Sequence, residues 1–409
     1  MKRLLVLGAG TAGTMVVNKL RPRLDPAEWQ ITIVDQDACH HYQPGYLFIP
    51  FGIYRRQDVE RPRRDFIPAG VEMVMAAIEE IDPARQRVSL AGGRHLDYDY
   101  VVVATGTHAT PSQTPDFEGP AVGDTIHQYY TLPGAMALYE RLKSWEGGRL
   151  VINIMETPFK CPVAPLEFTF LADWWFHEKG KRDKVEIVFA TPMGEVFTKP
   201  VAARHLAHVL EAKDIEVETD FYVERIDADA RNLVAYDGRE LPYDLLVTVP
   251  VNMGADVVAR SGLGDELNHI PVDRGTFLHA EHGNLFAIGD AASLPTSKAG
   301  AVAHFSVEVF AENFPRYAEG LEMVEQFDGH ANCFIESGFG KGLLIDFNYD
   351  TEPLPGKYPL PGIGPFSLLQ ETVTNHWGKM MFRWVYWNLL LRGREIPLPV
   401  AMSMYGKER

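Results

Sequence analysis

The chain has 409 residues, 46% hydrophobic and 23% charged, a globular composition long enough for two to three domains. Its 55 acidic residues outnumber 39 basic ones, and the net charge of −16 argues against a nucleic-acid-binding protein. Three cysteines are too few for a disulfide-stapled secreted protein. No uninterrupted apolar run of about 18 residues predicts a membrane-spanning helix, and glycines close to the N-terminus argue against a signal peptide.

A glycine motif opens the chain. Residues 3–7 predict a buried strand, residues 14–24 a helix, and residues 30–34 a second strand that ends at Asp35. Between the first strand and the helix stand Gly8, Gly10 and Gly13, in the spacing G-x-G-x-x-G. This context predicts a dinucleotide site, with a tight turn at Gly8, a pyrophosphate close to Gly10, close helix packing at Gly13 and a ribose on Asp35.

Two later segments extend this motif. Residues 98–106 form an apolar run ending in Thr105 and Gly106, and residues 285–290 end in Gly289 and Asp290. With the opening glycines, they resemble the flavoproteins that have two dinucleotide-binding domains. In that family the aspartate matching Asp290 holds the ribityl chain of FAD, so the resemblance implies an FAD cofactor.

The middle of the chain repeats the first part without its nucleotide chemistry. Residues 149–155 predict a strand, but no glycine fingerprint follows, and the strand at 185–189 lacks a terminal acid. We therefore expect no nicotinamide cofactor. The predicted fold is α/β, with two Rossmann-type domains and a C-terminal membrane-attachment region containing an amphipathic helix. The expected parts are 1–110 and 271–325 for FAD, 111–270 for the second domain and 326–409 for the last region.

Cys161 follows the lost phosphate loop, beside Lys160 and before a helix expected to reach about His177. A helix N-terminus and a neighbouring lysine predict a lowered thiol pKa and hence a reactive thiolate. Cys333 lies far downstream, and the sequence alone does not show that the two cysteines meet. On composition, two inert buried cysteines are the alternative.

The residues around both cysteines resemble the sulfide-oxidising flavoproteins, namely sulfide:quinone oxidoreductase and the flavoprotein subunit of flavocytochrome c sulfide dehydrogenase. The resemblance rests on residues 158–167, 332–333 and 289–304. It implies that Cys161 and Cys333 form a disulfide or polysulfide bridge over the flavin, which hydrosulfide attacks. It also implies Glu167 as general base and Lys298 as a positive charge at the flavin. The alternatives are a helix-end carboxylate and a solvated loop lysine.

Two departures from that family concern other cysteines. The flavocytochrome branch tethers FAD through a cysteine, and Pro44 stands at the comparable position here, so FAD is expected to be non-covalent. Cys39 is interpreted as a bystander. Most quinone-linked relatives carry a third functional cysteine between the two domains, and residues 111–145 contain none.

Residues 371–392 are apolar and aromatic, with three tryptophans, but charged residues interrupt them. From 371 to 409, six Lys or Arg stand against three Glu. This pattern predicts a helix lying on a membrane surface, with a helix packed on the domain or in a dimer contact as alternatives. The segment is similar to the C-terminal end of bacterial sulfide:quinone oxidoreductases, which implies monotopic attachment and a quinone channel. Candidate quinone-stacking residues are Phe334, Phe347, Tyr349 and Phe366.

The resulting hypothesis is oxidation of hydrogen sulfide to zero-valent sulfur or polysulfide, with two electrons passing through FAD to a membrane quinone. The protein is expected to lie on the surface of a prokaryotic inner membrane as a peripheral protein. No metal is expected, and the sequence is compatible with a homo-oligomer. A type II NADH:quinone oxidoreductase would need a second glycine fingerprint, and a flavocytochrome-type subunit would not need the membrane helix. A flavin-binding electron-transfer partner without turnover would not need two cysteines at the flavin.

Overall fold

The computed structural model describes residues 1–114, 117–360, 362–396 and 398–408. Its first domain is built on a five-stranded parallel sheet, ordered β21-β9-β1-β2-β5. The strands are β21 (Leu285–Ala287), β9 (Tyr100–Val103), β1 (Lys2–Leu7), β2 (Trp29–Asp35) and β5 (Val71–Met75). Their nearly continuous apolar runs suit a sheet covered on both faces. Because β21 pairs with β9, two stretches distant in sequence share this sheet, and α1 (Thr11–Leu20) packs against α7 (Gly300–Ala318) beside it.

The second domain repeats this plan. Its sheet has the order β11-β18-β12-β13-β14 and is also parallel. The elements are β11 (Ile126–His127), α3 (Leu132–Ser144), β12 (Gly148–Ile154), α4 (Ala164–Glu178), β13 (Val185–Ala190), α5 (Pro200–Ala212), β14 (Glu216–Glu218) and β18 (Leu245–Val249). Each domain also carries a three-stranded antiparallel sheet. These are β6 (Ile78–Asp82), β7 (Arg87–Leu90) and β8 (Arg94–Asp97) in the first, and β15 (Val223–Asp227), β16 (Asn232–Ala235) and β17 (Glu240–Pro242) in the second.

The chain crosses between the domains where β10 (Thr107–Ala109) pairs with β19 (Asn252–Gly254). Smaller elements complete the domains: β3 (Cys39–His41) paired with β4 (Glu60–Pro62), β20 (Ile270–Pro271) paired with β22 (Ala292–Ser293), and the helices α2 (Arg56–Val59) and α6 (Asp256–Arg260). The first helix stops at Leu20, four residues earlier than the sequence predicts, because the Arg21–Pro22 step cannot continue its hydrogen bonding.

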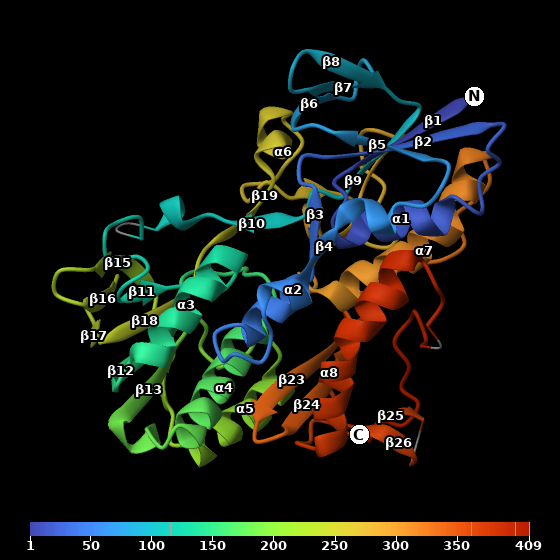
Figure 1. Cartoon of the computed structure of the whole chain (residues 1–409). Coiled ribbons are helices and arrows are strands. Elements are labelled where there is room, and N and C mark those ends of the chain that lie inside the picture. The colour runs from blue at the N-terminus through green and yellow to red at the C-terminus, as the bar shows by residue number, and fades with distance from the viewer. Residues whose placement is uncertain (115–116, 361, 397, 409) are drawn as a thin grey trace.

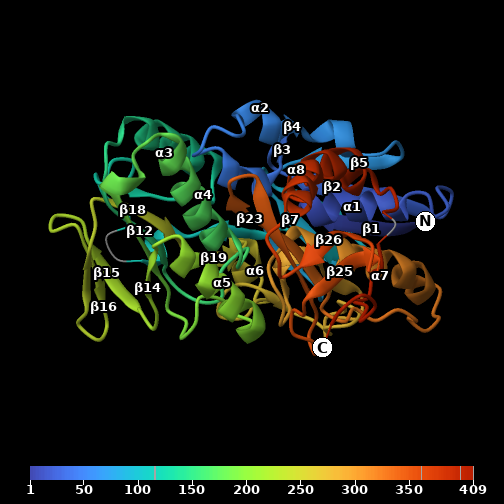
Figure 2. The same cartoon turned by 90° about the horizontal axis from the view of Figure 1, so that it is seen from below.

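The C-terminal region forms a mixed sheet with one long helix. The order is β23-β24-β26-β25, from β23 (Ala331–Gly338), β24 (Lys341–Phe347), β25 (Gly356–Leu360) and β26 (Gly364–Leu368), and α8 is Val373–Asn388. Strand β23 contacts α4, α7 and α8, so this sheet meets both domains (Figures 1 and 2). Within the described ranges, no helix has both the length and the apolar character needed to cross a bilayer.

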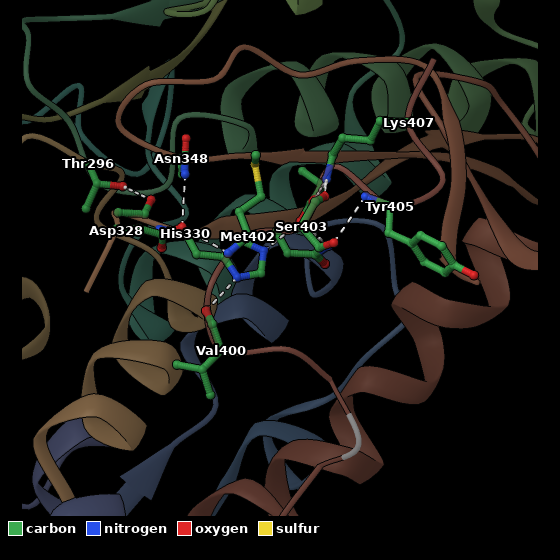
Figure 3. A network of polar contacts seen from close by, with 12 residues as sticks. Thr296, Asp328, His330, Asn348, Val400, Met402, Ser403, Tyr405 and Lys407 are labelled. Atoms are coloured by element: carbon green, nitrogen blue, oxygen red, sulfur yellow. Dashed lines mark hydrogen bonds and ion pairs between the residues drawn. The ribbon is translucent and has the colours of Figure 1, made fainter. Parts of the chain in front are cut away.

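The last described residues are fixed by a buried polar network, shown in Figure 3. Asp346 on β24 accepts a 2.7 Å hydrogen bond from Nε2 of His330, and its other oxygen pairs with Nζ of Lys407. The second ring nitrogen of His330 donates to the carbonyl of Val400 at 2.8 Å. The three ionisable side chains are about 1% exposed. Residues 400–407 are therefore tied to the strands that carry Cys333.

Candidate functional site

One cavity is lined by both domains and the C-terminal helix. Its wall includes nearly all the cofactor and catalytic residues that the sequence singled out, together with three residues of α8; these are Gly8, Gly10, Asp35, Thr105, Gly106, Cys161, Glu167, Gly289, Asp290, Lys298, Lys379, Phe382 and Tyr386. The nucleotide motifs and Cys161 thus face one space. Gly13 lies behind the loop rather than in the wall.

The glycine loop has the geometry of a phosphate-binding turn. Gly8 has a φ of 94°, and a Cβ there would lie 2.5 Å from the carbonyl oxygen of Ala104. A Cβ on Gly13 would collide with the carbonyl oxygen of Gly8, whereas one on Gly10 would meet nothing within 4 Å. Two glycines are therefore required by packing, and Gly10 leaves the approach to the backbone open at the start of α1.

Asp35 is fixed at the end of β2. Its Oδ2 accepts a 2.7 Å hydrogen bond from the backbone N–H of Ala9 and lies 3.0 Å from a guanidinium nitrogen of Arg63. Arg63 is almost fully buried and also donates to the carbonyl of Cys39. No sequence motif points to Arg63, since it lies in the short helix Arg63–Phe66 outside the glycine motif.

Two lysines surround Asp290. Nζ of Lys160 lies 2.9 Å from Oδ2 of Asp290 and 2.6 Å from Oε1 of Gln43. Burial pushes the pKa of Asp290 up, but Lys160 and Lys298 outweigh it and hold that pKa below its ordinary value. Lys298 is itself buried, which lowers its pKa to about 8 against the opposing pull of Asp290 and Asp265. Lys298 is thus a desolvated cation at the cavity wall rather than a solvated loop lysine.

Cys161 and Cys333 are both free thiols packed against the same apolar core. Cys161 has a φ of 56°, its N–H donates to the carbonyl of Lys298, and its own carbonyl accepts from Ala164 at the start of α4. Cys333 comes from the middle of β23. Burial is the main cause that raises the pKa of Cys333, and the negative charge of a Cys161 thiolate adds to the shift.

The predicted lowering of the Cys161 thiol pKa is wrong for this structure. Burial, aided by the charge of Glu167, raises the pKa of Cys161 to about 11. Burial raises the pKa of Cys333 as well. The lysine expected to stabilise a thiolate is instead held by Asp290, and desolvation outweighs the charge that remains.

Glu167 forms a buried ion pair with Lys379, 2.7 Å from Oε1 to Nζ. The pair also closes the edge of β23, because Glu167 accepts the N–H of Glu336 at 2.7 Å and Lys379 donates to the carbonyl of Phe334 at 2.9 Å. Two backbone groups of an edge strand are thereby satisfied without another strand. Burial raises the pKa of Glu167 even though Lys379 opposes the shift. Both side chains line the cavity.

Comparison with known proteins gives the same family as the cysteine segments. Residues 2–151 match the family model described as pyridine nucleotide-disulphide oxidoreductase. Mitochondrial sulfide:quinone oxidoreductases are 25% identical in Mus musculus, over 95% of this chain and 86% of that protein, and 26% identical in Dictyostelium discoideum, over 96% and 86%. The X-ray structure of sulfide:quinone oxidoreductase from Aquifex aeolicus superposes with a TM-score of 0.81 at 19% identity, covering 96% of this chain and 92% of that one.

This chain is a homologue of the sulfide:quinone oxidoreductases. The predicted resemblance is confirmed over most of the chain, and the α/β flavoprotein fold is confirmed by the family model and the superposition.

The aromatic residues of α8 supply a part of the site that the sequence did not identify. Phe382 and Tyr386 line the cavity, and the hydroxyl of Tyr386 lies 2.7 Å from Oγ1 of Thr11 and 2.7 Å from Nε2 of His40. From the sequence, these residues are expected to lie on a membrane surface, because the segment that contains them is rich in apolar and aromatic residues. Their spacing from Lys379, three and seven residues on, places all three on one helical face and could have revealed the site.

The four quinone candidates remain predictions. Phe334 and Phe366 pack edge to face, with ring centroids 5.0 Å apart, against α8. Phe347 lies beneath Nζ of Lys199, and Tyr349 contacts Arg274. None of these four is among the described residues that line the cavity.

Proposed function

We propose that this protein oxidises hydrogen sulfide to zero-valent sulfur or polysulfide and passes two electrons through FAD to a membrane quinone. The observation that carries the proposal is the cavity, where a nucleotide-binding loop, the Glu167–Lys379 pair and Cys161 meet. Cys333 packs against the same apolar core as Cys161 but is not among the described residues that line the cavity. The homology to sulfide:quinone oxidoreductases over most of the chain supports it.

The residues of the cavity suit FAD. The open backbone at Gly10 would hold the pyrophosphate, Asp35 the adenosine ribose and Asp290 the ribityl chain. The buried hydroxyl of Thr105 has no hydrogen-bond partner in the described part of the chain, as expected of a group that a ligand satisfies. When bound, FAD supplies a two-electron acceptor between sulfur and quinone. Pro44 lines the cavity and offers no sulfur for a covalent link.

The two cysteines carry the sulfur chemistry once they are oxidised to a disulfide. Hydrosulfide attacks one sulfur of the Cys161–Cys333 bond, which breaks to leave a persulfide on one cysteine and a thiolate on the other. Because burial holds the pKa of Cys161 near 11, a sulfur left there at neutral pH takes up a proton unless a base removes it. Glu167, in the same cavity wall, is the base.

Membrane attachment is part of the proposal. On α8, Val373, Trp377, Met381 and Trp384 form one stripe, and each is more than half exposed. Leu360 and Ile363 of the β25–β26 hairpin are also exposed. An apolar surface of this kind suits the interface of a bilayer. A prokaryotic inner membrane and a homo-oligomer remain predictions.

Three of the six basic residues expected to support attachment are paired with acids of the protein instead. Lys379 pairs with Glu167, Arg383 with Asp58 and Lys407 with Asp346. The exposed face of α8 is therefore apolar rather than basic.

The test compares variants of Cys161 and Cys333 with a control variant of Cys39. In the anaerobic holoenzyme, sulfide should bleach the flavin at once, and short-chain quinone should restore its colour. Cys161→Ser and Cys333→Ser should each abolish sulfide-dependent quinone reduction while the flavin absorbance stays, whereas Cys39→Ser should behave as wild type. Full activity in either of the first two variants would sink the proposal.

The same bleaching assay distinguishes the proposed function from that of an enzyme that takes its electrons from a nicotinamide cofactor. The segment after β12 carries buried Met155 and Phe159 in place of a glycine loop, so NADH should not bleach the flavin. Rapid bleaching by NADH would instead indicate the type II dehydrogenase reaction.

A further inference from the structure

A second acid–histidine pair lies next to the site and has no role in the reaction described so far. Nδ1 of His376 lies 2.9 Å from each carboxylate oxygen of Glu336. The Glu336 side chain is 3% exposed and that of His376 is 22% exposed. One member of the pair is therefore sealed inside, and the other reaches the surface beside exposed Trp377.

This pair connects directly to the acid–base pair in the cavity. The backbone N–H of Glu336 donates to Glu167, and His376 stands one helical turn before Lys379 on α8. The titratable and charged groups around Glu336 are Glu167 from α4, His376 and Lys379 from α8, and Tyr54 from the loop before α2. The order from solvent inward is thus His376, Glu336, then Glu167 with Lys379, which lines the cavity.

We propose that His376 and Glu336 form the route by which a solvent proton reaches the Glu167–Lys379 pair when quinone is reduced. The inference rests on the proposed function. It assigns His376 as the entry group, Glu336 as the buried carrier and Lys379 as the exit at the cavity.

The overall reaction needs such a route. One hydrosulfide, one quinone and one proton give one zero-valent sulfur atom and one quinol. Hydrosulfide loses two electrons and its own proton, while the quinone gains two electrons and two protons. One proton must therefore come from solvent. Within the pair, Glu167 is 1% exposed and Lys379 is 13% exposed, and both line the cavity that FAD would fill, so a route from the other side would reach them without crossing the cofactor.

The surroundings of Glu336 make its carboxyl easier to protonate than an exposed one. Burial raises the pKa of its carboxyl, and Glu167 raises it further, while His376 opposes the shift. The step from Glu336 to Glu167 crosses from one carboxyl group to the next by rotation of the Glu336 side chain or through one water molecule. A histidine with one nitrogen on the acid and its ring edge at the surface can reload Glu336 after each transfer.

The experiment compares two half-reactions in the FAD-loaded protein. His376→Ala and Glu336→Gln should reduce at the wild-type rate with sulfide but reoxidise with short-chain quinone at least tenfold more slowly at pH 8. The defect should shrink at pH 6, where protons are abundant. Imidazole added to His376→Ala should restore most of the reoxidation rate, and His208→Ala, which removes an exposed histidine of α5, should match wild type.

The outcomes separate the route from the function it serves. If wild type is not bleached by sulfide, the proposed function fails and the route fails with it. If wild type turns over and His376→Ala keeps the wild-type pH profile of reoxidation, the route alone is overturned. A loss that is equal at every pH and untouched by imidazole also overturns it, because that pattern belongs to a structural role. Infrared spectra give a readout besides activity: the band of a protonated carboxyl should be present in wild type and absent in Glu336→Gln.

Discussion

At the scale of single residues, burial decides the chemistry of this site more than neighbouring charge does. Cys161 has a lysine next to it in sequence and a helix just after it, yet its pKa is raised to about 11 by burial. A thiol in this state is a poor nucleophile until it is deprotonated. Under the proposed function, a disulfide between Cys161 and Cys333 would be the form that sulfide attacks, and Glu167 would act after that attack.

The ion pair between Glu167 and Lys379 gives a prediction on stability. Lys379→Met leaves a carboxylate buried without its cation, which should lower the free energy of unfolding by about 3–5 kcal/mol. The double variant Glu167→Gln/Lys379→Met should regain part of that loss, because no charge is then left unpaired. Urea unfolding of the three proteins checks this. Equal midpoints for the single and double variants would contradict it.

The sequence was informative about residues whose role is local. The glycine spacing and the acids at Asp35 and Asp290 depend on strand–turn–helix context, and the structure places all of them around one loop and cavity. The pKa of Cys161 and the partners of Lys379 depend on contacts between segments far apart in the chain. Contacts between distant segments leave no local pattern in the sequence, so the sequence does not predict them.

At the scale of elements, α8 has two faces of different character. One face sends Lys379, Phe382 and Tyr386 into the cavity, and the opposite face carries the exposed stripe with Trp377 and Trp384. The sequence predicts an amphipathic helix, but the interpretation of the sequence places all of its aromatic residues on the membrane surface. Helical periodicity shows which residues share a face, and only the fold shows which face meets the cavity.

This division predicts how the protein binds vesicles. Trp377→Ser/Trp384→Ser should weaken binding to liposomes at least tenfold, because each exposed tryptophan adds about 1.5–3 kcal/mol on burial. Turnover with a soluble short-chain quinone should stay at the wild-type level. Tyr236→Ser, at an exposed position in the second domain, serves as the control in liposome cosedimentation.

Salt should have little effect on that binding, because the lysine and arginine of α8 are already paired within the protein. Cosedimentation at low and high ionic strength measures the effect. A steep loss of binding with salt would mean that exposed basic residues near the C-terminus, such as Arg392 and Arg394, carry the attachment instead.

At the scale of the whole molecule, two repeated domains are joined by a third part that belongs to neither. The repeat is visible in the sequence because apolar strand segments of the first part recur in the second. The segment at residues 242–248, for example, resembles the one at residues 98–105. The position of the C-terminal sheet is not visible in the sequence, since it depends on contacts of β23 with α4 of the second domain and α7 of the first. The site exists only where all three parts meet.

The network around Asp346 predicts how stability depends on pH. Burial pushes the pKa of Asp346 up, but His330 and Lys407 outweigh it and hold the pKa below the ordinary 3.8. A depressed folded-state pKa means that the stabilisation is present above pH 3.8 and is lost as the pH falls through the folded value.

Asp346→Asn should therefore cost about 3–5 kcal/mol at pH 7, because the buried Lys407 loses its counter-charge. The difference from wild type should shrink once the pH falls below the depressed pKa, where the wild-type carboxyl is neutral too. Urea unfolding of both proteins across that range measures it. A difference that is constant with pH would show that Asp346 acts by its shape rather than its charge.

The anchoring of residues 400–407 also sets an order of assembly during synthesis. Strands β23 and β24, which carry Cys333 and Asp346, leave the ribosome well before Lys407 does. The two nucleotide-type sheets can form on the growing chain, since their strands all lie before residue 290. The strand that carries Cys333 is thus among the last parts to be secured, and a nascent chain can form both nucleotide-type sheets before Cys333 reaches its final position.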